Sequence, residues 1–132
     1  MKQTLDHRQL EDLRTILKSR ARQLREEIRQ TLVKSDDEQY TMIADQVRDL
    51  EDDSFADLMV DVNLAEIDRD LQELRLIDAA FLRMSDGTYG LCDACDTPIE
   101  IERLRATPFA SRCFDCQSSF ERNHVQNIGH TL

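Results

Sequence analysis

All four cysteines of this 132-residue chain lie within residues 92–116, in two pairs. Cys92 and Cys95 are separated by two residues, as are Cys113 and Cys116, and 17 residues lie between the pairs. A two-residue gap lets one tight turn direct both sulfurs at one ion, and two such turns complete a tetrahedron of thiolates around Zn²⁺. We therefore predict one structural zinc ion bound by these four cysteines. Since that shell has no open position, no catalytic role is expected.

The same residues leave some alternatives open. A dithiol redox switch would use the same cysteines, although nothing in the sequence marks one thiol as a nucleophile. His124 offers a replacement ligand, yet a fourth cysteine is already present. Four thiolates around a divalent ion leave a charge of −2, which Arg103, Arg105 and Arg112 are close enough in sequence to offset. The competing interpretation of these arginines is that they are ordinary surface residues.

The composition favours helices as the elements that position this cluster. Apolar residues make up 40% and charged residues 33% of the chain, which contains three glycines and two prolines. Apolar side chains from Leu10 to Leu32 recur at steps of three, four or seven, which predicts a helix over about 6–33. A second stripe from Val60 to Met84 predicts a helix from Asp53 or Ser54 to about Ser85. The two stripes are expected to bury each other as a long antiparallel coiled-coil hairpin.

Shorter elements complete the predicted architecture. Ser35 and Glu38 resemble a capping box before a short helix over 37–48, with Ile43 and Val47 facing inward. The hairpin tip is expected near residues 49–54, with the bend near Asp36 as the alternative. We predict a mainly α fold with two domains, a helical hairpin over 1–86 and a zinc-finger module over 87–132. The module would end in a helix over about 113–125.

The negative charge is concentrated in one segment. Residues 36–61 contain ten acidic residues and one basic residue, which accounts for −9 of the net charge of −10. Such a field repels phosphate backbones, so direct sequence-specific DNA binding is not expected. The alternative interpretation is a solvated acidic face. Phe109, Phe114 and Phe120 do not alternate with a basic stripe and are expected to pack around the metal site.

The sequence also bears on location. The start has no apolar core flanked by basic residues, and no apolar run approaches the roughly 18 residues of a membrane span. A cytoplasmic protein without a membrane segment is therefore expected. In a reducing compartment, paired cysteines more often bind metal than form disulfides.

Two stretches resemble the DksA/TraR family of transcription factors. TYGLCDACDTPIEIERLRATPFASRCFDCQ is similar to the zinc finger of that family, and LRTILKSRARQLREEI is similar to its first coiled-coil helix. The resemblance covers about residues 10–120. It implies a protein that is not an enzyme, that binds RNA polymerase, and that inserts its coiled coil into the secondary channel to modulate transcription initiation.

The resemblance also assigns a tip motif, DxxDxA. The matching residues are Asp49, Asp52 and Ser54, so both carboxylates are present and serine replaces the alanine. These side chains are expected to contact the polymerase near its active centre. The alternative is that Asp49 and Asp52 only form a turn or cap a helix.

The positions that the family uses for the alarmone ppGpp differ here. The resemblance places them at Leu76, Thr107 and Gln117, which are neutral. A cation that pairs with phosphate cannot be replaced by a neutral side chain without losing most of the contact. We therefore expect weak or absent ppGpp dependence. Separately, we expect the protein to be a monomer. The competing functions are a zinc-stabilised coiled-coil adaptor for another protein and a thiol redox sensor.

Overall fold

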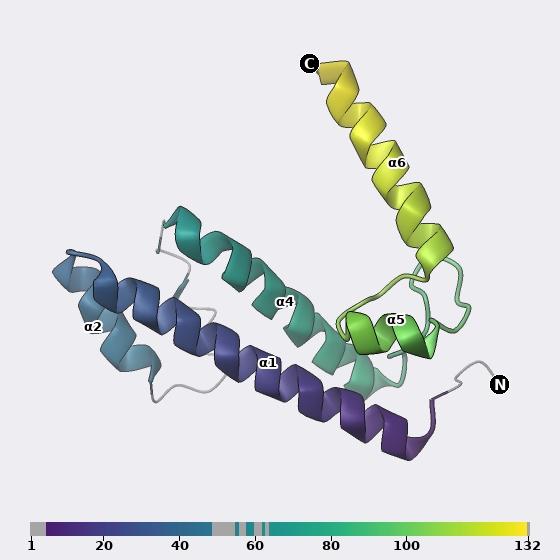
Figure 1. Cartoon of the computed structure of the whole chain (residues 1–132), viewed down its shortest axis with the longest axis horizontal. Coiled ribbons are helices and arrows are strands. Elements are labelled where there is room, and N and C mark those ends of the chain that lie inside the picture. The colour runs from purple at the N-terminus through teal and green to yellow at the C-terminus, as the bar shows by residue number, and fades with distance from the viewer. Residues whose placement is uncertain (1–4, 49–54, 56–57, 60–61, 63, 132) are drawn as a thin grey trace. The chain divides into compact units, whose positions relative to one another are not determined.

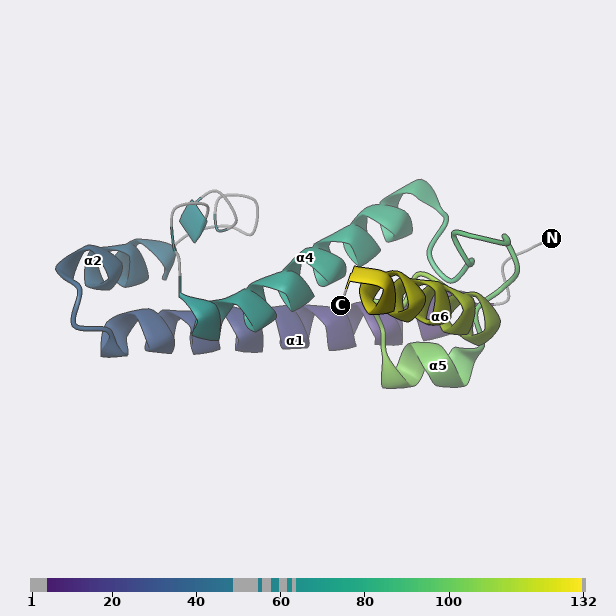
Figure 2. The same cartoon turned by 90° about the horizontal axis from the view of Figure 1, so that it is seen from above.

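The computed structural model describes residues 5–48, 55, 58, 59, 62 and 64–131, and for 124–131 it describes the backbone alone. Its helices are α1 (His7–Lys34), α2 (Glu38–Val47), α4 (Ala65–Asp86), α5 (Ile101–Ala106) and α6 (Phe114–Thr131) (Figure 1). An isolated antiparallel β-bridge joins Leu91 to Pro98. The long helices α1 and α4 lie side by side in both views (Figures 1 and 2). The predicted mainly helical fold with paired long helices is confirmed.

The chain divides into two compact units. Unit 1 comprises Met1–Leu17 with Ile77–Leu132, and unit 2 comprises Lys18–Leu76. Each of the long helices therefore contributes one part to each unit. The predicted domains, 1–86 and 87–132, separate the helical hairpin from the zinc-finger module and do not correspond to these compact units. They stay a prediction.

The first helix begins where its sequence predicts. The Asp6 carboxylate accepts a hydrogen bond from the Gln9 backbone N–H at 2.7 Å, and the Asp6 N–H donates to Gln9 Oε1 at 3.0 Å. This reciprocal pair satisfies N–H groups that have no partner within the helix. The observed bounds of α1 differ from the predicted ones by one residue at each end.

The core of unit 2 consists of the predicted stripes together with α2. Each of its large aliphatic side chains contributes about 1.5–3 kcal/mol relative to full exposure. The buried side chains of this core are Ala21, Leu24, Ile28 and Leu32 of α1, Ala44 and Val47 of α2, Phe55, Met59, and Ile67, Leu71 and Leu74 of α4. The periodic residues that lie in unit 2 thus form a shared interior.

Helix α2 has a different cap from the predicted one. The Asp37 carboxylate accepts from the Gln39 N–H at 2.8 Å, whereas the Ser35 hydroxyl donates to the Leu32 carbonyl at the end of α1. The capping box predicted from Ser35 and Glu38 is therefore wrong. Asp37 lies next to the first helical residue, and its carboxylate is the stronger acceptor for an N-terminal N–H.

The start of the second long helix also differs from the prediction. Val62 and Leu64 are not helical, and α4 begins at Ala65. The Val62 N–H donates to the Met59 carbonyl at 3.2 Å, which closes a turn before α4. The sequence VDVN at 60–63 consists of residues with modest helix propensity, so the apolar stripe alone does not sustain a helix there. A helix starting at Asp53 or Ser54 and running unbroken to Ser85 is excluded.

A polar cluster links α1 to α4 within unit 2. Arg20 donates to both carboxylate oxygens of Glu73, at 2.6 and 3.0 Å. Asp70 lies beside Glu27, and burial followed by the negative charge of Glu27 raises the pKa of Asp70 above its ordinary value of 3.8. The two carboxyl groups therefore share their site best when one is protonated.

Replacement of Asp70 with asparagine should raise the melting temperature of the protein, and this gain over the parent should increase with pH. Because the pKa is raised in the folded state, the favourable contribution of Asp70 is complete below 3.8 and is lost as the pH rises through the folded pKa. An asparagine side chain avoids that loss, so the variant should melt about 1–2 °C higher than the parent at pH 8, with a smaller advantage at pH 5. Circular dichroism at 222 nm measures both midpoints.

The control is Asp68→Asn, an exposed residue in the first turn of α4. Its neutralisation removes a favourable interaction with the helix N-terminus and relieves no repulsion. No gain is expected for it. An equal gain in both variants would contradict the assigned Asp70–Glu27 repulsion.

Among the described residues, no helix combines the length and apolar character that crossing a bilayer requires.

Candidate metal centre

The first cysteine pair lies in a tight turn after α4. The Cys92 N–H donates to the Thr97 carbonyl at 2.8 Å, and the Asp96 N–H donates to the Cys92 carbonyl at 2.9 Å. The Ala94 N–H points at Cys92 Sγ, 3.4 Å away. Asp96 has a φ of 62°, a left-handed conformation that aspartate tolerates better than most residues. This turn closes the loop so that Cys92 and Cys95 face the same point.

The second pair lies at the start of α6. Cys113 precedes the helix and its carbonyl accepts from the Gln117 N–H at 2.9 Å, while Cys116 lies in the first turn. The Asp93 N–H donates to the Ser111 carbonyl at 2.8 Å and joins the two cysteine loops. The helix predicted over 113–125 is therefore present and extends to Thr131.

The two loops bring all four thiols together. The four Sγ atoms lie within 4.8 Å of one another, and Cys95 Sγ and Cys113 Sγ are 3.8 Å apart. Cys92 and Cys113 are buried, Cys116 is half-buried and Cys95 is exposed. This donor set fits a four-coordinate structural zinc, since thiolates are the ligands that zinc prefers in closed sites.

The thiols themselves favour a cation at this point. Burial raises the pKa of Cys92, but backbone N–H groups of Cys113, Ala94 and Cys95 outweigh it and lower the pKa to about 6. Hydrogen bonds to Cys113, Cys95 and Cys92 raise the pKa of Cys116 to about 12. One thiol thus ionises readily while another resists a second negative charge. A divalent ion removes that conflict, which is how metal binding displaces thiol protons.

The comparison with known sequences agrees with this geometry. Residues 87–122 match the prokaryotic dksA/traR C4-type zinc finger. This finger belongs to the DksA/TraR family. The match includes both cysteine pairs, the turn at Asp96 and the start of α6, so the predicted resemblance is confirmed and the cluster is consistent with one structural Zn²⁺.

Similarity to members of the DksA/TraR family extends beyond the finger. The chain is 28% identical over 125 residues, 95% of its length and 80% of the relative's, to the RNA polymerase-binding transcription factor DksA of Escherichia coli (strain K12). It is 27% identical, over 95% of its length and 83% of the relative's, to the protein of the same name from Haemophilus influenzae. General stress protein 16O of Bacillus subtilis is 40% identical over 65 residues, 49% of this chain and 39% of the relative.

Solved structures resemble the described fold as well. The DnaK suppressor protein from Agrobacterium tumefaciens has a TM-score of 0.56 at 29% identity, covering 83% of this chain and 92% of the other. The transcription factor DksA2 from Pseudomonas aeruginosa has a TM-score of 0.61 at 21% identity, covering 91% and 88%. At that identity, the second likeness concerns the fold alone.

Two arginines fasten the loops of the DksA/TraR finger. The Arg103 Nε–H donates to the Arg112 carbonyl at 2.8 Å. The Arg112 guanidinium lies 3.5 Å from the Asp93 carboxylate and 4.3 Å from the centre of the Phe120 ring. Both residues therefore act next to cysteines of the cluster. Arg105 instead pairs with Glu102 at 3.2 Å.

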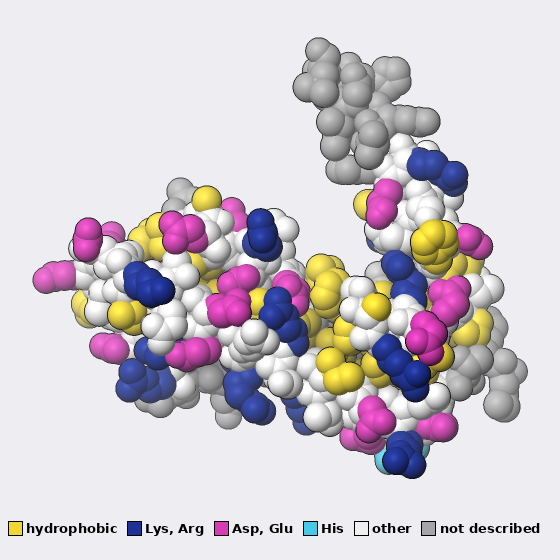
Figure 3. Space-filling model, viewed as in Figure 1, with side chains coloured by type: hydrophobic (Ala, Val, Ile, Leu, Met, Phe, Trp, Pro, Cys, Tyr) yellow, Lys and Arg dark blue, Asp and Glu magenta, His cyan; other side chains and the backbone are white. Residues whose placement is uncertain are grey.

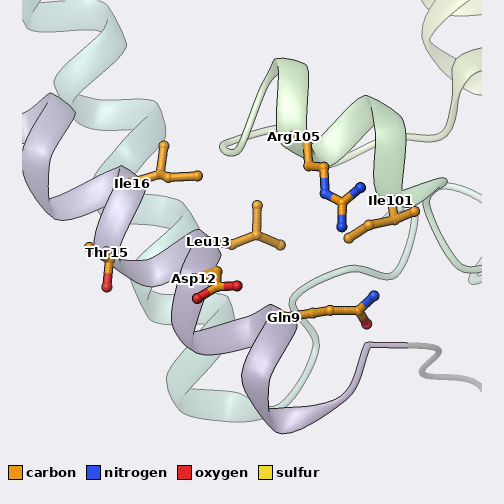
Figure 4. Close-up of a pocket in the computed structure, with 7 residues that line it drawn as sticks. All are labelled: Gln9, Asp12, Leu13, Thr15, Ile16, Ile101 and Arg105. Atoms are coloured by element: carbon orange, nitrogen blue, oxygen red, sulfur yellow. The ribbon is translucent and has the colours of Figure 1, made fainter.

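Arg105 lines a cavity in unit 1 between the start of α1 and α5. Its volume is about 550 Å³, and Figure 4 shows Arg105 reaching from α5 beside Ile101, across from Leu13 and Gln9 of α1. Leu13 is buried, whereas Ile16 at the rim is 45% exposed. The charge compensation predicted for Arg103, Arg105 and Arg112 stays a prediction, although Arg103 and Arg112 contact the cysteine loops.

A buried tyrosine fastens the finger to the end of α4. Tyr89 is 1% exposed and donates its hydroxyl to the Pro108 carbonyl at 2.8 Å, while Arg83 of α4 donates to the Phe109 carbonyl at 3.2 Å. Burial raises the pKa of Tyr89 to about 12, although the charge of Arg83 opposes the shift. No role for Tyr89 is predicted from the sequence. The available signal in the sequence is the position of this aromatic residue, directly before Gly90 and the first cysteine pair.

Two of the three phenylalanines differ from the prediction, whereas Phe109 is half-buried. Phe114 is 63% and Phe120 is 47% exposed, so neither forms the interior of the finger. The buried residues are Tyr89, Ile99 and Leu104, the last on α5, a helix that the sequence analysis did not predict. Both exposed phenylalanines lie on α6, which begins between the two cysteines of the second pair. The predicted tip residues Asp49, Asp52 and Ser54 lie outside the described residues.

Proposed function

We propose that this protein is a transcription regulator that binds RNA polymerase directly and has no enzymatic activity of its own. One observation carries the proposal: the relatives named RNA polymerase-binding transcription factor DksA align over 95% of this chain, through the paired helices as well as the finger. A finger alone is a stabilising module that many proteins share in outline. The extent of the alignment favours a common function over an unrelated adaptor.

The proposed mechanism uses the paired helices as a probe of the polymerase secondary channel. A single helix with its side chains is about 10–12 Å wide, so two packed helices form a narrow element. We propose that Asp49, Asp52 and Ser54 contact the polymerase and modulate initiation without performing chemistry. This part rests on the sequence motif and on the acidic charge of residues 36–61. Action in the cytoplasm as a monomer belongs to the same proposal.

Weak or absent ppGpp dependence is also part of the proposal. Leu76 is 48% exposed and presents an alkyl group where a phosphate ligand requires a cation. Thr107 is neutral, and the Gln117 side chain accepts a hydrogen bond from Arg112 at 3.5 Å. Arg75 and Arg105 lie close in sequence, but Arg105 is engaged with Glu102. A shift by one helical position turns a side chain by about 100°, so neighbours do not substitute directly.

The test is capture and transcription with purified RNA polymerase from the source organism. The tagged, zinc-loaded protein should retain core polymerase, and a transcript-cleavage factor that occupies the secondary channel should displace it. In vitro transcription from a sensitive promoter should change when the protein is added. Addition of ppGpp should alter that effect less than about twofold, since the neutral positions supply no charge-assisted contact.

Two outcomes would count against the proposal in different ways. Failure to retain polymerase at micromolar concentration favours the adaptor alternative and rejects the function as a whole. Retention with a strong ppGpp requirement rejects only the predicted independence from the alarmone. Zinc release and loss of polymerase binding at low peroxide would instead favour the redox sensor.

A further inference from the structure

A polar groove lies between α1 and the end of α2, entirely within unit 2. Its volume is about 560 Å³, and its lining includes Arg22, Arg25 and Arg29 of α1 and Arg48, which follows α2. We call this feature the arginine groove and define it by these four residues. Figure 3 shows basic side chains interspersed with acidic ones over α2 and the end of α1. The groove includes none of the positions to which the resemblance assigns ppGpp.

The spacing of the arginines makes them converge. Positions i, i+3 and i+7 lie on one face of a helix, and the span from Arg22 to Arg29 is about 10.5 Å of helix axis. Arg48 adds a fourth guanidinium from a second element. Four cations lie in one groove of a protein whose net charge is −10. Because like charges that share one face repel each other, an anion seated among them would be stabilised.

One carboxylate among the lining residues occupies part of this positive site. Glu26 accepts hydrogen bonds from Arg29 Nε at 3.0 Å and Nη2 at 2.7 Å, and from Gln30 at 2.9 Å. The bonds from Arg29 and then from Gln30 lower the pKa of Glu26 to about 2, so it stays ionised. Asp45 of α2 also acts on Arg29 and raises its pKa, after Glu26. An incoming anion must therefore compete with Glu26 for Arg29.

The shape and chemistry of the groove restrict the class of ligand. A volume of this size suits a small molecule. Val47 is the one apolar side chain among the described lining residues, and no aromatic ring is among them to stack a base. A protein surface usually needs an apolar centre in its partner site, which this groove does not offer. Planar guanidinium groups are suited to phosphate oxygens, which they bind in pairs.

We propose that the arginine groove binds a compact anion that carries two or more phosphate groups. Successive phosphates lie close enough to contact arginines on adjacent turns of α1 at once. A single phosphate engages fewer of these cations and should bind more weakly. The proposal is argued from the residues that line the groove and does not depend on the proposed function.

The experiment is a titration of the zinc-loaded full chain with inorganic tripolyphosphate, diphosphate and monophosphate at constant ionic strength. Two-dimensional NMR should show saturable shifts at residues 19–29 and 47–48. Affinity should fall about tenfold or more from tripolyphosphate to monophosphate, because charge-assisted contacts are lost. The double variant R22Q/R29Q should bind tripolyphosphate at least about tenfold more weakly.

Two further variants keep the proposal falsifiable. Glu26→Gln should bind tripolyphosphate severalfold more tightly, because it removes the competing carboxylate from Arg29 and leaves every arginine in place. Arg69→Gln, which alters an exposed arginine of α4 outside the groove, should change affinity less than about twofold. Equal weakening by R69Q and R22Q/R29Q, or no saturation by any phosphate, would overturn the assignment. Tighter binding of a polyglutamate peptide than of tripolyphosphate would overturn it in favour of a protein-docking surface.

Discussion

Replacement of Cys113 with serine, or removal of zinc with a strong chelator, should unfold the DksA/TraR finger. Cys113 is 7% exposed and lies where the second loop meets α6, so its sulfur joins both parts of the module. Structural zinc contributes about 10–16 kcal/mol in isolated fingers, which is comparable with the whole stability of an ordinary domain, about 5–15 kcal/mol. A small interior around Tyr89, Ile99 and Leu104 cannot offset that loss.

Tyr89 provides a specific measurement of this unfolding. Burial raises its pKa to about 12 in the folded finger, and an exposed tyrosine ionises near 10. Absorbance at 295 nm during an alkaline titration should therefore show Tyr89 ionising about two pH units earlier in C113S than in the parent. Metal analysis should give one zinc per chain for the parent and much less for the variant.

The matched control is Ala110→Ser, because Ala110 is also 7% exposed and lies in the same loop. This change introduces the same hydroxyl at an equally buried position without removing a ligand. It should retain one zinc and the late ionisation of Tyr89. If C113S keeps its zinc and has the same melting temperature as A110S, Cys113 is not a required ligand and the four-sulfur assignment is wrong.

Local periodicity in the sequence predicts the long helices well where burial and propensity agree. The stripe of α1 is continuous, its start is capped by Asp6 and Gln9, and its bounds are predicted to one residue. The end of α4 is likewise predicted, because Asp86 is followed by Gly87, which adopts a φ of +82°. In both places the apolar pattern and the terminating residues indicate the same boundary.

Periodicity predicts a helix boundary poorly where helix propensity disagrees with it. Apolar residues continue through Val60 and Leu64 at helical spacing, yet the chain turns between Met59 and Val62 before α4 starts. Buried Phe55 and Met59 satisfy the same apolar pattern outside α4. Hydrophobic spacing therefore reports burial more reliably than it reports an unbroken helix.

Short elements and tertiary sites are predicted less well for a related reason. Helix α5 has six residues, too few for periodicity to reveal, although its Leu104 is fully buried. The cysteine pairs are predicted because their spacing alone specifies the site. The arginine groove cannot be predicted from the sequence, because Arg48 lies near the α1 arginines only as a result of the packing of α2. A charge count along the sequence instead emphasises the surrounding acidic residues.

Replacement of Asp52 with asparagine should separate polymerase binding from regulation. Asp52 lies outside the described residues, and its role rests on the DxxDxA motif in the segment that holds ten acidic residues. Asparagine retains the size of aspartate but cannot make a charge-assisted hydrogen bond, worth about 1.5–3 kcal/mol. The effect on promoter complexes should therefore drop about tenfold or more, while affinity for polymerase, which we assign to the wider helical surface, changes less than about twofold.

The neighbouring substitution Asp53→Asn is the matched control, because it removes the same charge from the adjacent residue, a position that the DxxDxA motif leaves unspecified. In vitro transcription at saturating protein should show near-normal regulation by D53N and a severe loss for D52N. Equal losses would mean that the segment acts by its total charge, with no specific contact at Asp52. D52N could instead lose affinity for polymerase and still regulate normally at saturating concentration, which would mean that Asp52 is an anchoring residue. A carboxylate that acts at the active centre must change the outcome after binding is complete.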